Sequence, residues 1–464
     1  MQHADSESGM QGGAFPTRLR PLQEHKAYAL LIALMATVYA WASLAARSGA
    51  FGFNQLGYMQ PAAVAVTYAV GALLIWMAGW VAKSHRLKRI AAQLASPLDS
   101  NGGALRKISA LLLISLACVI VFWALRTNFF NSDTNDYKRK FARDVPVLGF
   151  HVTHDEMLEL YVHSRFWHYA NLFLAWSVVR SYQVLSVLAG GAFVFLLLVF
   201  ARLLLPYRWP ALFALVVSAG FMQLFFGDAE NYTLTSVIIL GYLLAGCLAI
   251  RGTISVVIPS AVLAVAMCFH LLAGWLLPSL LYLYWLSVRR RQYRAMAVGV
   301  ALSCLIVGLT LAYFHFHGLP ITELFYRSHI SGHGLHYGEV LALPSLGYYA
   351  EITNLLFLMF PALPFFVPLL WFNRIERTPL NTFLGLASAL MLVFMYVWRA
   401  TLGVYNDWNL FAAGAIPLAL LLAYNFLRMD DLPHRTRILV GILLTSAVPS
   451  YAWIVSNHFF AYTH

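Results

Sequence analysis

Charged residues are scarce in this sequence. Only 11% of its 464 residues are Asp, Glu, Lys or Arg, whereas 61% are hydrophobic, and the mean hydropathy is +0.70. A soluble protein of this length could not bury so much apolar surface. Apolar segments of about 17–22 residues recur along the chain and match a hydrocarbon core roughly 30 Å thick. They lack the alternation of membrane β-strands, so the sequence predicts an all-α polytopic membrane protein.

Cysteines and familiar catalytic motifs are also sparse. The four cysteines all lie inside apolar segments without metal-type spacing, so no disulfide framework is expected. The chain has no GxSxG, HExxH or Walker motif, which disfavours ATP-driven work and chemistry on soluble nucleotide sugars. The net charge of +12 does not require a nucleic acid partner, because Lys and Arg gathered in cytoplasmic loops explain it.

Hydropathy predicts about thirteen membrane spans. An N-terminus in the cytoplasm places most of the 31 basic residues inside. Two long loops then lie outside, 127–182 and 317–351, and the second half of the first one predicts an amphipathic helix along the membrane surface. The predicted spans are 28–46, 62–82, 108–126, 183–204, 209–226, 233–250, 253–269, 271–288, 296–316, 352–372, 381–398, 410–427 and 437–456.

This pattern divides the chain into three parts. Residues 1–107 form a cytoplasmic tail and two accessory spans. Residues 108–430 form a catalytic core that carries both outside loops. Residues 431–464 form the last span and an outside C-terminus.

Unusual polar residues gather on the predicted outer face. The stretch "QLFFGDAENYTLT" places Asp228 and Glu230 in a turn too short to need two carboxylates. Ionisable groups near hydrocarbon are costly and mark functional sites. The other candidates on this face are Asp133, Asp136, Glu156, Asn231, Tyr232, His270, Arg327, His329, Glu351, Arg399 and Asp407.

Structural roles for some of these residues stay open. Asp228 or Glu230 could cap the helix over 233–250, because negative charge suits a helix N-terminus. Glu156 has capping-box spacing to a threonine three residues earlier. His270 could be a core histidine bonded to a backbone carbonyl, and Asp407 could be an N-cap. The histidines within 329–336 could bind Zn or Mn, although their spacing matches no specific motif.

The residue types on this face favour group transfer from a lipid phosphate. A carboxylate at the membrane edge can act as a general base toward an acceptor hydroxyl or amine. Arg and His can stabilise a phosphate leaving group. We therefore expect transfer to an acceptor outside the membrane.

Several stretches, in their order along the chain, resemble one superfold. "HDEMLELYVHSRFW" has the character of a juxtamembrane helix, and "FGDAENYTLT" is similar to a G-x-x-E-N-Y stretch. "CFHLLAGWLLPSLLYL" and "YNDWNLF" resemble later elements, although Asn409 replaces the second acid of a D-W-D-L-F pattern. Together, over 108–430, they resemble the membrane glycosyltransferases of the GT-C superfold, which include protein mannosyltransferases and the lipid A aminoarabinose transferase.

The resemblance implies a sugar donor linked to polyprenyl phosphate or diphosphate. The acceptor would be a membrane lipid or an envelope glycan or protein, on the periplasmic face of a bacterial inner membrane. No cofactor or metal ligand is assigned, and a divalent cation (Mg or Mn) stays open. The implied roles are base for Asp133 or Asp136, second acid for Asp228 or Glu230, and donor phosphate contacts for His270, Arg327, His329 and Arg399.

Two other functions are weighed against this one. A flippase or transporter of a lipid-linked glycan would have charged residues near mid-membrane and inverted repeats, and neither is evident. A glycan polymerase or ligase would carry more arginines outside, where 317–351 holds only Arg327.

Overall fold

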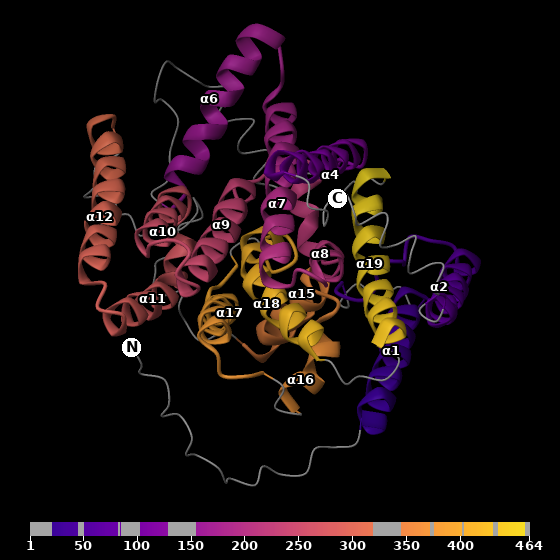
Figure 1. Cartoon of the computed structure of the whole chain (residues 1–464). Helices are drawn as coiled ribbons and strands as arrows, with labels where there is room; N and C mark the ends of the chain where they lie inside the picture. Colours follow the sequence, from indigo (N-terminus) through magenta and orange to yellow (C-terminus); the bar gives the residue numbers. More distant parts are fainter. Residues whose placement is uncertain are drawn as a thin grey trace, which may run out of the picture.

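The computed structural model describes residues 21–44, 51–81, 84, 103–128, 155–318, 345–371, 375–400, 403–429 and 435–459. All regular elements among these residues are helical, and no strand occurs there (Figure 1). The elements are α1 (Pro21–Leu44), α2 (Pro61–Val81), α4 (Ala104–Ala124), α6 (Met157–Leu174), α7 (Val178–Leu204), α8 (Trp209–Val217), η2 (Gly220–Phe225), α9 (Thr233–Ile250), α10 (Val257–Phe269), η3 (Leu271–Leu276), α11 (Leu277–Arg289), α12 (Tyr293–Phe316), α15 (Leu346–Met359), η4 (Leu363–Phe366), α16 (Val367–Trp371), α17 (Pro379–Val397), α18 (Trp408–Arg428) and α19 (Arg435–Phe459).

The chain is a multi-pass membrane protein. Within the described ranges, ten helices are long and apolar enough to cross a membrane, or eleven if a bent pair counts as one span. This pair, Leu346–Met359 and Leu363–Leu369, turns by 90° at its break.

The predicted count of thirteen spans is not confirmed. Segment 209–226 forms the nine-residue α8 followed by the 3-10 turn η2, and segment 253–269 contains the 13-residue α10. At 1.5 Å per residue, α10 is about 20 Å long and falls short of a bilayer core. Hydropathy counted these segments as spans because it does not detect where a helix breaks.

The helix predicted within the first outside loop is confirmed as α6. It lies outside the long apolar spans and projects from the bundle together with the start of α7 (Figure 1).

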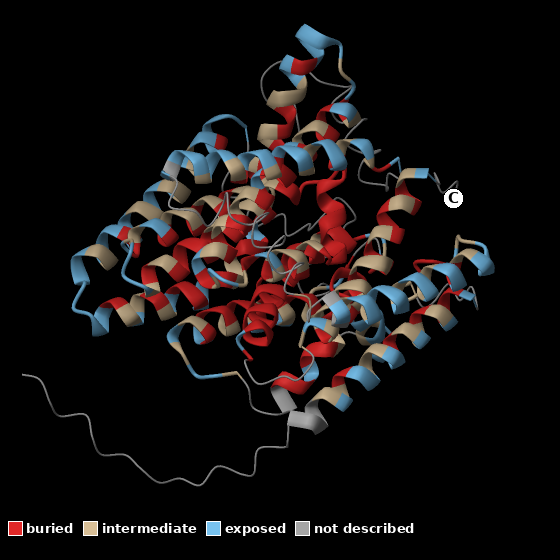
Figure 2. Ribbon diagram, turned by 45° about the vertical axis from the view of Figure 1, so that its right-hand side comes forward, coloured by how far each residue is buried: buried red, intermediate tan, exposed pale blue. Residues whose placement is uncertain are grey.

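The bundle is built around α18. Almost every residue of α18 is buried, and α8, α9, α15 and α17 pack around it (Figure 2). Small residues in its first half let neighbours approach closely, as is usual for helix packing in membranes. At Gly414, an added Cβ would lie 3.2 Å from the Met395 sulfur.

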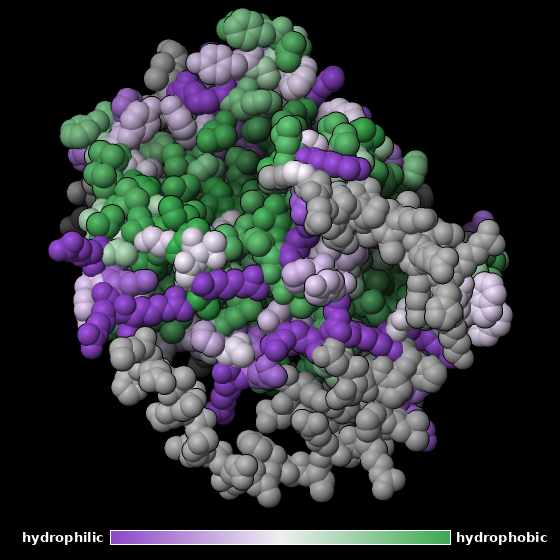
Figure 3. Space-filling model, viewed as in Figure 1, coloured by the Kyte–Doolittle hydropathy of each residue, from purple (hydrophilic) through white to green (hydrophobic). Residues whose placement is uncertain are grey.

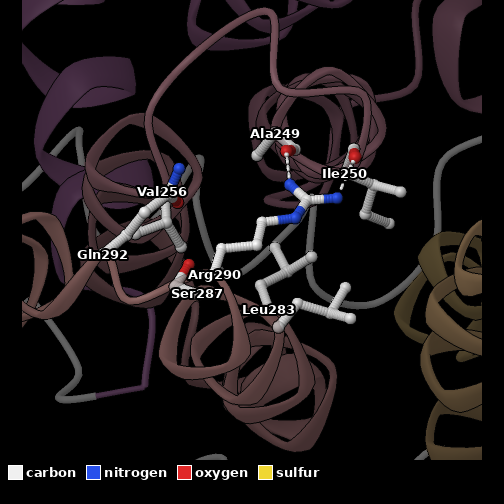
Figure 4. Close-up of a pocket in the computed structure, with 8 residues that line it drawn as sticks. Ala249, Ile250, Val256, Leu283, Ser287, Arg290 and Gln292 are labelled. Carbon is white, nitrogen blue, oxygen red and sulfur yellow. Dashed lines mark hydrogen bonds between the residues drawn. The ribbon is translucent and has the colours of Figure 1, made fainter. Parts of the chain in front are cut away.

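Arginines cap the C-terminal ends of three helices. Arg251 donates to the Leu203 carbonyl of α7, and Arg208 and Arg435 donate to the Leu427 carbonyl of α18. Arg290 donates to the carbonyls of Ala249 and Ile250 at the end of α9, at 3.0 and 2.5 Å (Figure 4). These carbonyls have no partner within their helices and carry the negative end of the helix dipole.

The arginine-bearing ends form a polar border to the bundle. In Figure 3, hydrophilic side chains form a band below a broad hydrophobic area, on the side where α11 turns into α12. The hollow beside Arg290 has a volume of about 10 Å³, so it holds at most a water molecule and is not a ligand site.

We predict that Arg290→Ala lowers the free energy of unfolding by about 1–2 kcal/mol, because two carbonyls lose a charged donor. The melting temperature of the detergent-solubilised protein measures the effect. Arg294→Ala, which removes an exposed arginine from the same region, is the matched control. Equal melting temperatures for the two variants would contradict a capping role.

Candidate active site

The acid turn lies between η2 and α9 and is almost completely buried. Asp228 is 8% exposed, Glu230 1% and Asn231 0%. Gly227 begins the turn with a φ of 72°, a conformation that residues with a Cβ rarely adopt. A Cβ added there would also lie 2.8 Å from the Cβ of Arg126. Gly227 therefore lets the turn fold tightly beneath the end of α4.

The start of α6 lies against this turn. Asn231 Nδ2 donates to Glu156 Oε2 at 2.9 Å, and the Tyr182 hydroxyl donates to Asn231 Oδ1 at 3.0 Å. His270 Nε2 lies 3.5 Å from Glu156 Oε1, and the Leu271 N–H donates to the Asp155 carbonyl at 2.8 Å. The turn, α6, α7 and the break after α10 therefore meet around Glu156.

Glu159 caps α9 from outside that helix. Its carboxylate accepts from the N–H groups of Leu234 and Thr235, both at 3.1 Å, and from the Thr235 hydroxyl at 2.8 Å. Glu159 is completely buried. Burial raises the pKa of Glu159 to about 8, although these three donors favour its charged form.

His163 lies one turn further along α6. Its Nδ1 donates to the Glu159 carbonyl at 2.9 Å, and its ring stacks on Tyr182 with centroids 4.1 Å apart. Burial lowers the pKa of His163 to about 4. The imidazole is therefore neutral at pH 7 and cannot neutralise the nearby carboxylates.

Three carboxylates crowd around one hydroxyl. The charges of Glu230, Glu156 and Glu159 all act on the Tyr182 hydroxyl. The charge of Glu156 adds to the burial that raises the pKa of Glu159. Glu159 can therefore hold a proton near neutral pH, which is the property that acid–base chemistry requires.

Asp228 faces the start of α18. Burial raises the pKa of Asp228 to about 7, while the Asn409 amide and the Ala229 N–H favour its charged form. Among the described residues, its Oδ2 has no hydrogen-bond partner. Asp228 is thus a buried carboxyl group whose pKa lies near neutrality.

A second polar group surrounds Tyr348 on α15. Its hydroxyl accepts from the Ala400 N–H at 3.0 Å, and the charges of Asp407, Glu351 and Arg399 act on it. Glu351 and Arg399 are exposed, whereas Asp407 is only 6% exposed. Three residues predicted from sequence therefore meet beside the start of α18.

The structure bears on the helix-capping roles that the sequence left open for Asp228, Glu230 and Glu156. The N-cap position of α9 is Tyr232, and the N–H groups of Leu234 and Thr235 in its first turn donate to Glu159. Glu156 is the N-cap residue of α6 and not its third residue, so the capping box does not form.

His270 and Asp407 also differ from the simple expectation. His270 Nδ1 accepts from the Leu272 N–H at 3.1 Å, so the predicted bond to a backbone carbonyl is wrong. Asp407 occupies the N-cap position of α18, but its side chain makes no capping bond. Tyr232 lies beside His270, with ring centroids 5.2 Å apart.

Four predicted residues lie outside the described residues: Asp133, Asp136, Arg327 and His329. Within the described ranges, no group of three or more His, Cys, Asp or Glu is arranged to hold a metal ion. The divalent cation left open by the sequence stays a prediction.

Sequence reasoning missed Glu159, His163, Tyr182 and Asn409 as parts of this site. The spacing of Glu156 and Glu159 was the one available signal, because residues three apart share a helix face. Tyr182 was read as the end of a loop, and its role depends on packing against α6.

We predict that stability depends on pH through Glu159. A carboxyl whose pKa is raised in the folded state keeps its proton there longer than in the unfolded chain, so stability falls as pH rises from about 4.5 to 8. The advantage of the wild type over Glu159→Gln should therefore shrink over this range. Melting temperatures measured from pH 4.5 to 9 provide the test, and an advantage that grows with pH would contradict it.

Comparison with solved structures places this arrangement in a known fold. No protein-family model matches the chain, and a search of curated proteins finds no match. Two crystal structures of ArnT from Cupriavidus metallidurans are similar, one bound to undecaprenyl phosphate and one in the apo state. Each has a TM-score of 0.52 and 13% identity; the alignments cover 76% and 75% of this chain and 78% of ArnT. The chain therefore has a GT-C-like fold, as the resemblance predicted.

Proposed function

We propose that the protein is a membrane glycosyltransferase that moves a sugar from a polyprenyl-phosphate or polyprenyl-diphosphate donor to an acceptor on the extracytoplasmic face. The observation that carries the proposal is the group of carboxyl side chains at the acid turn and the start of α6 in a GT-C-like fold: Asp228, Glu230 and Glu159 are buried, and Glu156 is partly buried beside them. A similar structure, that of ArnT, is bound to undecaprenyl phosphate.

In the proposed reaction, a carboxylate removes the proton of an acceptor hydroxyl or amine as this group attacks the anomeric carbon. The bond between that carbon and the phosphate oxygen breaks, and polyprenyl phosphate leaves with the electron pair. The base is Asp133 or Asp136, and Asp228 or Glu230 orients the acceptor or the base.

The phosphate would be held by arginine and histidine side chains on the same face. Arg399 stands in the Tyr348 group beside the start of α18, and His270 stands beside Glu156. Arg327 and His329 keep the phosphate-contact roles implied by the resemblance. Hydrogen bonds from an arginine to phosphate are charge-assisted and strengthen as negative charge develops on the leaving group.

The proposed orientation places the N-terminus in the cytoplasm of a bacterial cell and the site at the periplasmic face of the inner membrane. This orientation is supported by the different charged residues at the two ends of the bundle. The carboxylates lie at the starts of α9 and α18, and the capping arginines lie at their ends. Basic residues favour the cytoplasmic side.

We predict that Asp133→Asn or Asp136→Asn lowers turnover about 10²–10⁴-fold, the usual contribution of a general base. The full chain in vesicles is supplied with a panel of undecaprenyl-phosphate-linked sugars and an envelope lipid extract, and release of undecaprenyl phosphate is followed. Arg294→Ala on the opposite end is the control and should retain activity.

Two outcomes would contradict the proposal. Release that persists when Asp133, Asp136, Asp228 and Glu230 are all neutralised would exclude the carboxylate mechanism. Transbilayer movement of the donor without release of the sugar would favour a flippase.

We also predict that substitutions of Arg399 and Asp228 affect binding of the lipid phosphate differently. Arg399→Gln should weaken binding of undecaprenyl phosphate alone by about tenfold, through loss of a charge-assisted contact. Asp228→Asn should bind it at least as well as the wild type, because a negative charge is removed. Native mass spectrometry with undecaprenyl phosphate measures both, and weaker binding by Asp228→Asn would assign that carboxyl to donor binding.

A further inference from the structure

His270 lies at the break between α10 and η3, and the backbone of this break holds its ring. The residue follows the last turn of α10 and occupies the N-cap position of η3. Its Nδ1 accepts from the Leu272 N–H at 3.1 Å, and its carbonyl accepts from the Ala273 N–H at 3.1 Å. The first turn of η3 therefore fixes the imidazole through Nδ1.

The bond to Leu272 decides which ring nitrogen carries the proton. A nitrogen that accepts a hydrogen bond holds no proton, so the proton of the neutral imidazole is on Nε2. Nε2 of His270 is buried, makes no hydrogen bond within the described ranges, and lies 3.5 Å from Glu156 Oε1. Glu156 is thus the acceptor that the structure places beside this N–H group.

The second oxygen of Glu156 is held from the acid turn. Oε2 accepts from Asn231 Nδ2 at 2.9 Å. Asn231 Oδ1 accepts from the Tyr182 hydroxyl at 3.0 Å, which fixes the end of the amide that faces Glu156. Each carboxylate oxygen therefore has one polar neighbour. Because a carboxylate has about four acceptor positions, further positions remain for a substrate.

Glu156 is also the most accessible carboxyl group of this cluster. Its side chain is 13% exposed, whereas Asp228, Glu230 and Glu159 are buried. It occupies the N-cap position of α6, but its side chain makes no capping bond there. The carboxylate is therefore not used by its own helix, and a substrate can reach it without displacing the acid turn.

We propose that Glu156 contacts the acceptor and that His270 is a positioning residue, which holds the Glu156 carboxylate through its Nε2–H group. The inference rests on the proposed glycosyl transfer and deepens it. Glu156 accepts a hydrogen bond from an O–H or N–H group of the acceptor that the base does not deprotonate, and so orients the acceptor toward the sugar. The acceptor therefore presents a hydroxyl or amine at this point and not an anionic group.

For His270, this role replaces the phosphate contact implied by the resemblance. Nδ1 is already occupied by the Leu272 N–H, and Nε2 is buried beside Glu156. Neither ring nitrogen is left for a phosphate oxygen. Arg399, Arg327 and His329 keep the phosphate contacts proposed for them.

Two amide variants separate this role from a purely structural one, in which His270 only caps η3 through Nδ1. An Asn side chain places its oxygen near the position of the imidazole Nδ1, whereas a Gln side chain places its amide nitrogen near the position of Nε2. His270→Asn therefore keeps the cap and loses the donor to Glu156. His270→Gln keeps the donor and loses the cap, so the two variants are matched controls for each other.

The test follows release of undecaprenyl phosphate by the full chain in vesicles, with an undecaprenyl-phosphate-linked sugar as donor and limiting envelope lipid extract as acceptor. His270→Asn should lower the rate about tenfold to hundredfold, the value of one hydrogen bond to a charged group, with the KM for the donor unchanged. His270→Gln should recover most of this loss, although its melting temperature falls below that of His270→Asn. Glu156→Gln should resemble His270→Asn, because an amide nitrogen cannot accept from Asn231 or His270.

The opposite pattern would overturn the proposal. An equal loss of rate in both His270 variants, or a loss confined to His270→Gln, would leave His270 as a cap of η3. A raised KM for the donor in His270→Asn would assign the imidazole to the phosphate.

A second measurement does not depend on sugar transfer. Nitrogen NMR of the full chain with isotope-labelled histidine reports which ring nitrogen carries the proton, and His270→Asn assigns the signal by its loss. We expect a neutral ring with its proton on Nε2 and an Nε2 signal that shifts in Glu156→Gln. A proton on Nδ1, or a signal that ignores Glu156→Gln, would overturn the positioning role even in an active enzyme. A wild type that shows the expected Nε2 signal but releases no undecaprenyl phosphate would overturn the proposed function, and with it the acceptor contact, while the contact between His270 and Glu156 stands.

Discussion

The carboxylate of Glu159 holds the first turn of α9, and the candidate active site depends on this contact. It satisfies two N–H groups that a helix leaves open at its start. At the N-cap position of α6, Glu156 holds Asn231 in the turn that leads into α9. Two acids at the start of α6 thus fix both the acid turn and the helix that follows it. Because α6 lies outside the membrane spans and α9 is one of them, this junction sets the depth of Asp228 and Glu230.

Charged side chains along the bundle complement the helix dipoles. Carboxylates stand at the starts of α9 and α18, where dipoles favour negative charge, and arginines cap the ends of α7, α9 and α18. Buried carboxyl groups remain expensive even there, which is why burial raises the pKa values of Glu159 and Asp228.

The two accessory spans are joined to the core differently from the other helices. Helix α2 is mostly exposed to the bilayer, and α1 has a hollow on either side. Both helices pack against α19, and the short segment between them adds contacts with the core, where Phe51 packs against Tyr405 and Phe53 against Phe357. Tyr405 precedes Asp407 by two residues, so the segment between α1 and α2 covers the core beside the polar group around Tyr348.

The sequence alone determined the membrane class, the position of most spans, the presence of α6 and the GT-C resemblance. These follow from composition, from apolar runs and from the order of short motifs, which are local properties of the chain. The number of spans could not be counted reliably, since a helix break such as the one at His270 leaves hydropathy unchanged. Tertiary structure alone decided which acid caps α9, which partner His270 faces and which groups surround Tyr182. Glu159 and Thr235 are 76 residues apart, and no local pattern encodes such a contact, because it exists only once α6, α7 and α9 have packed together and excluded water.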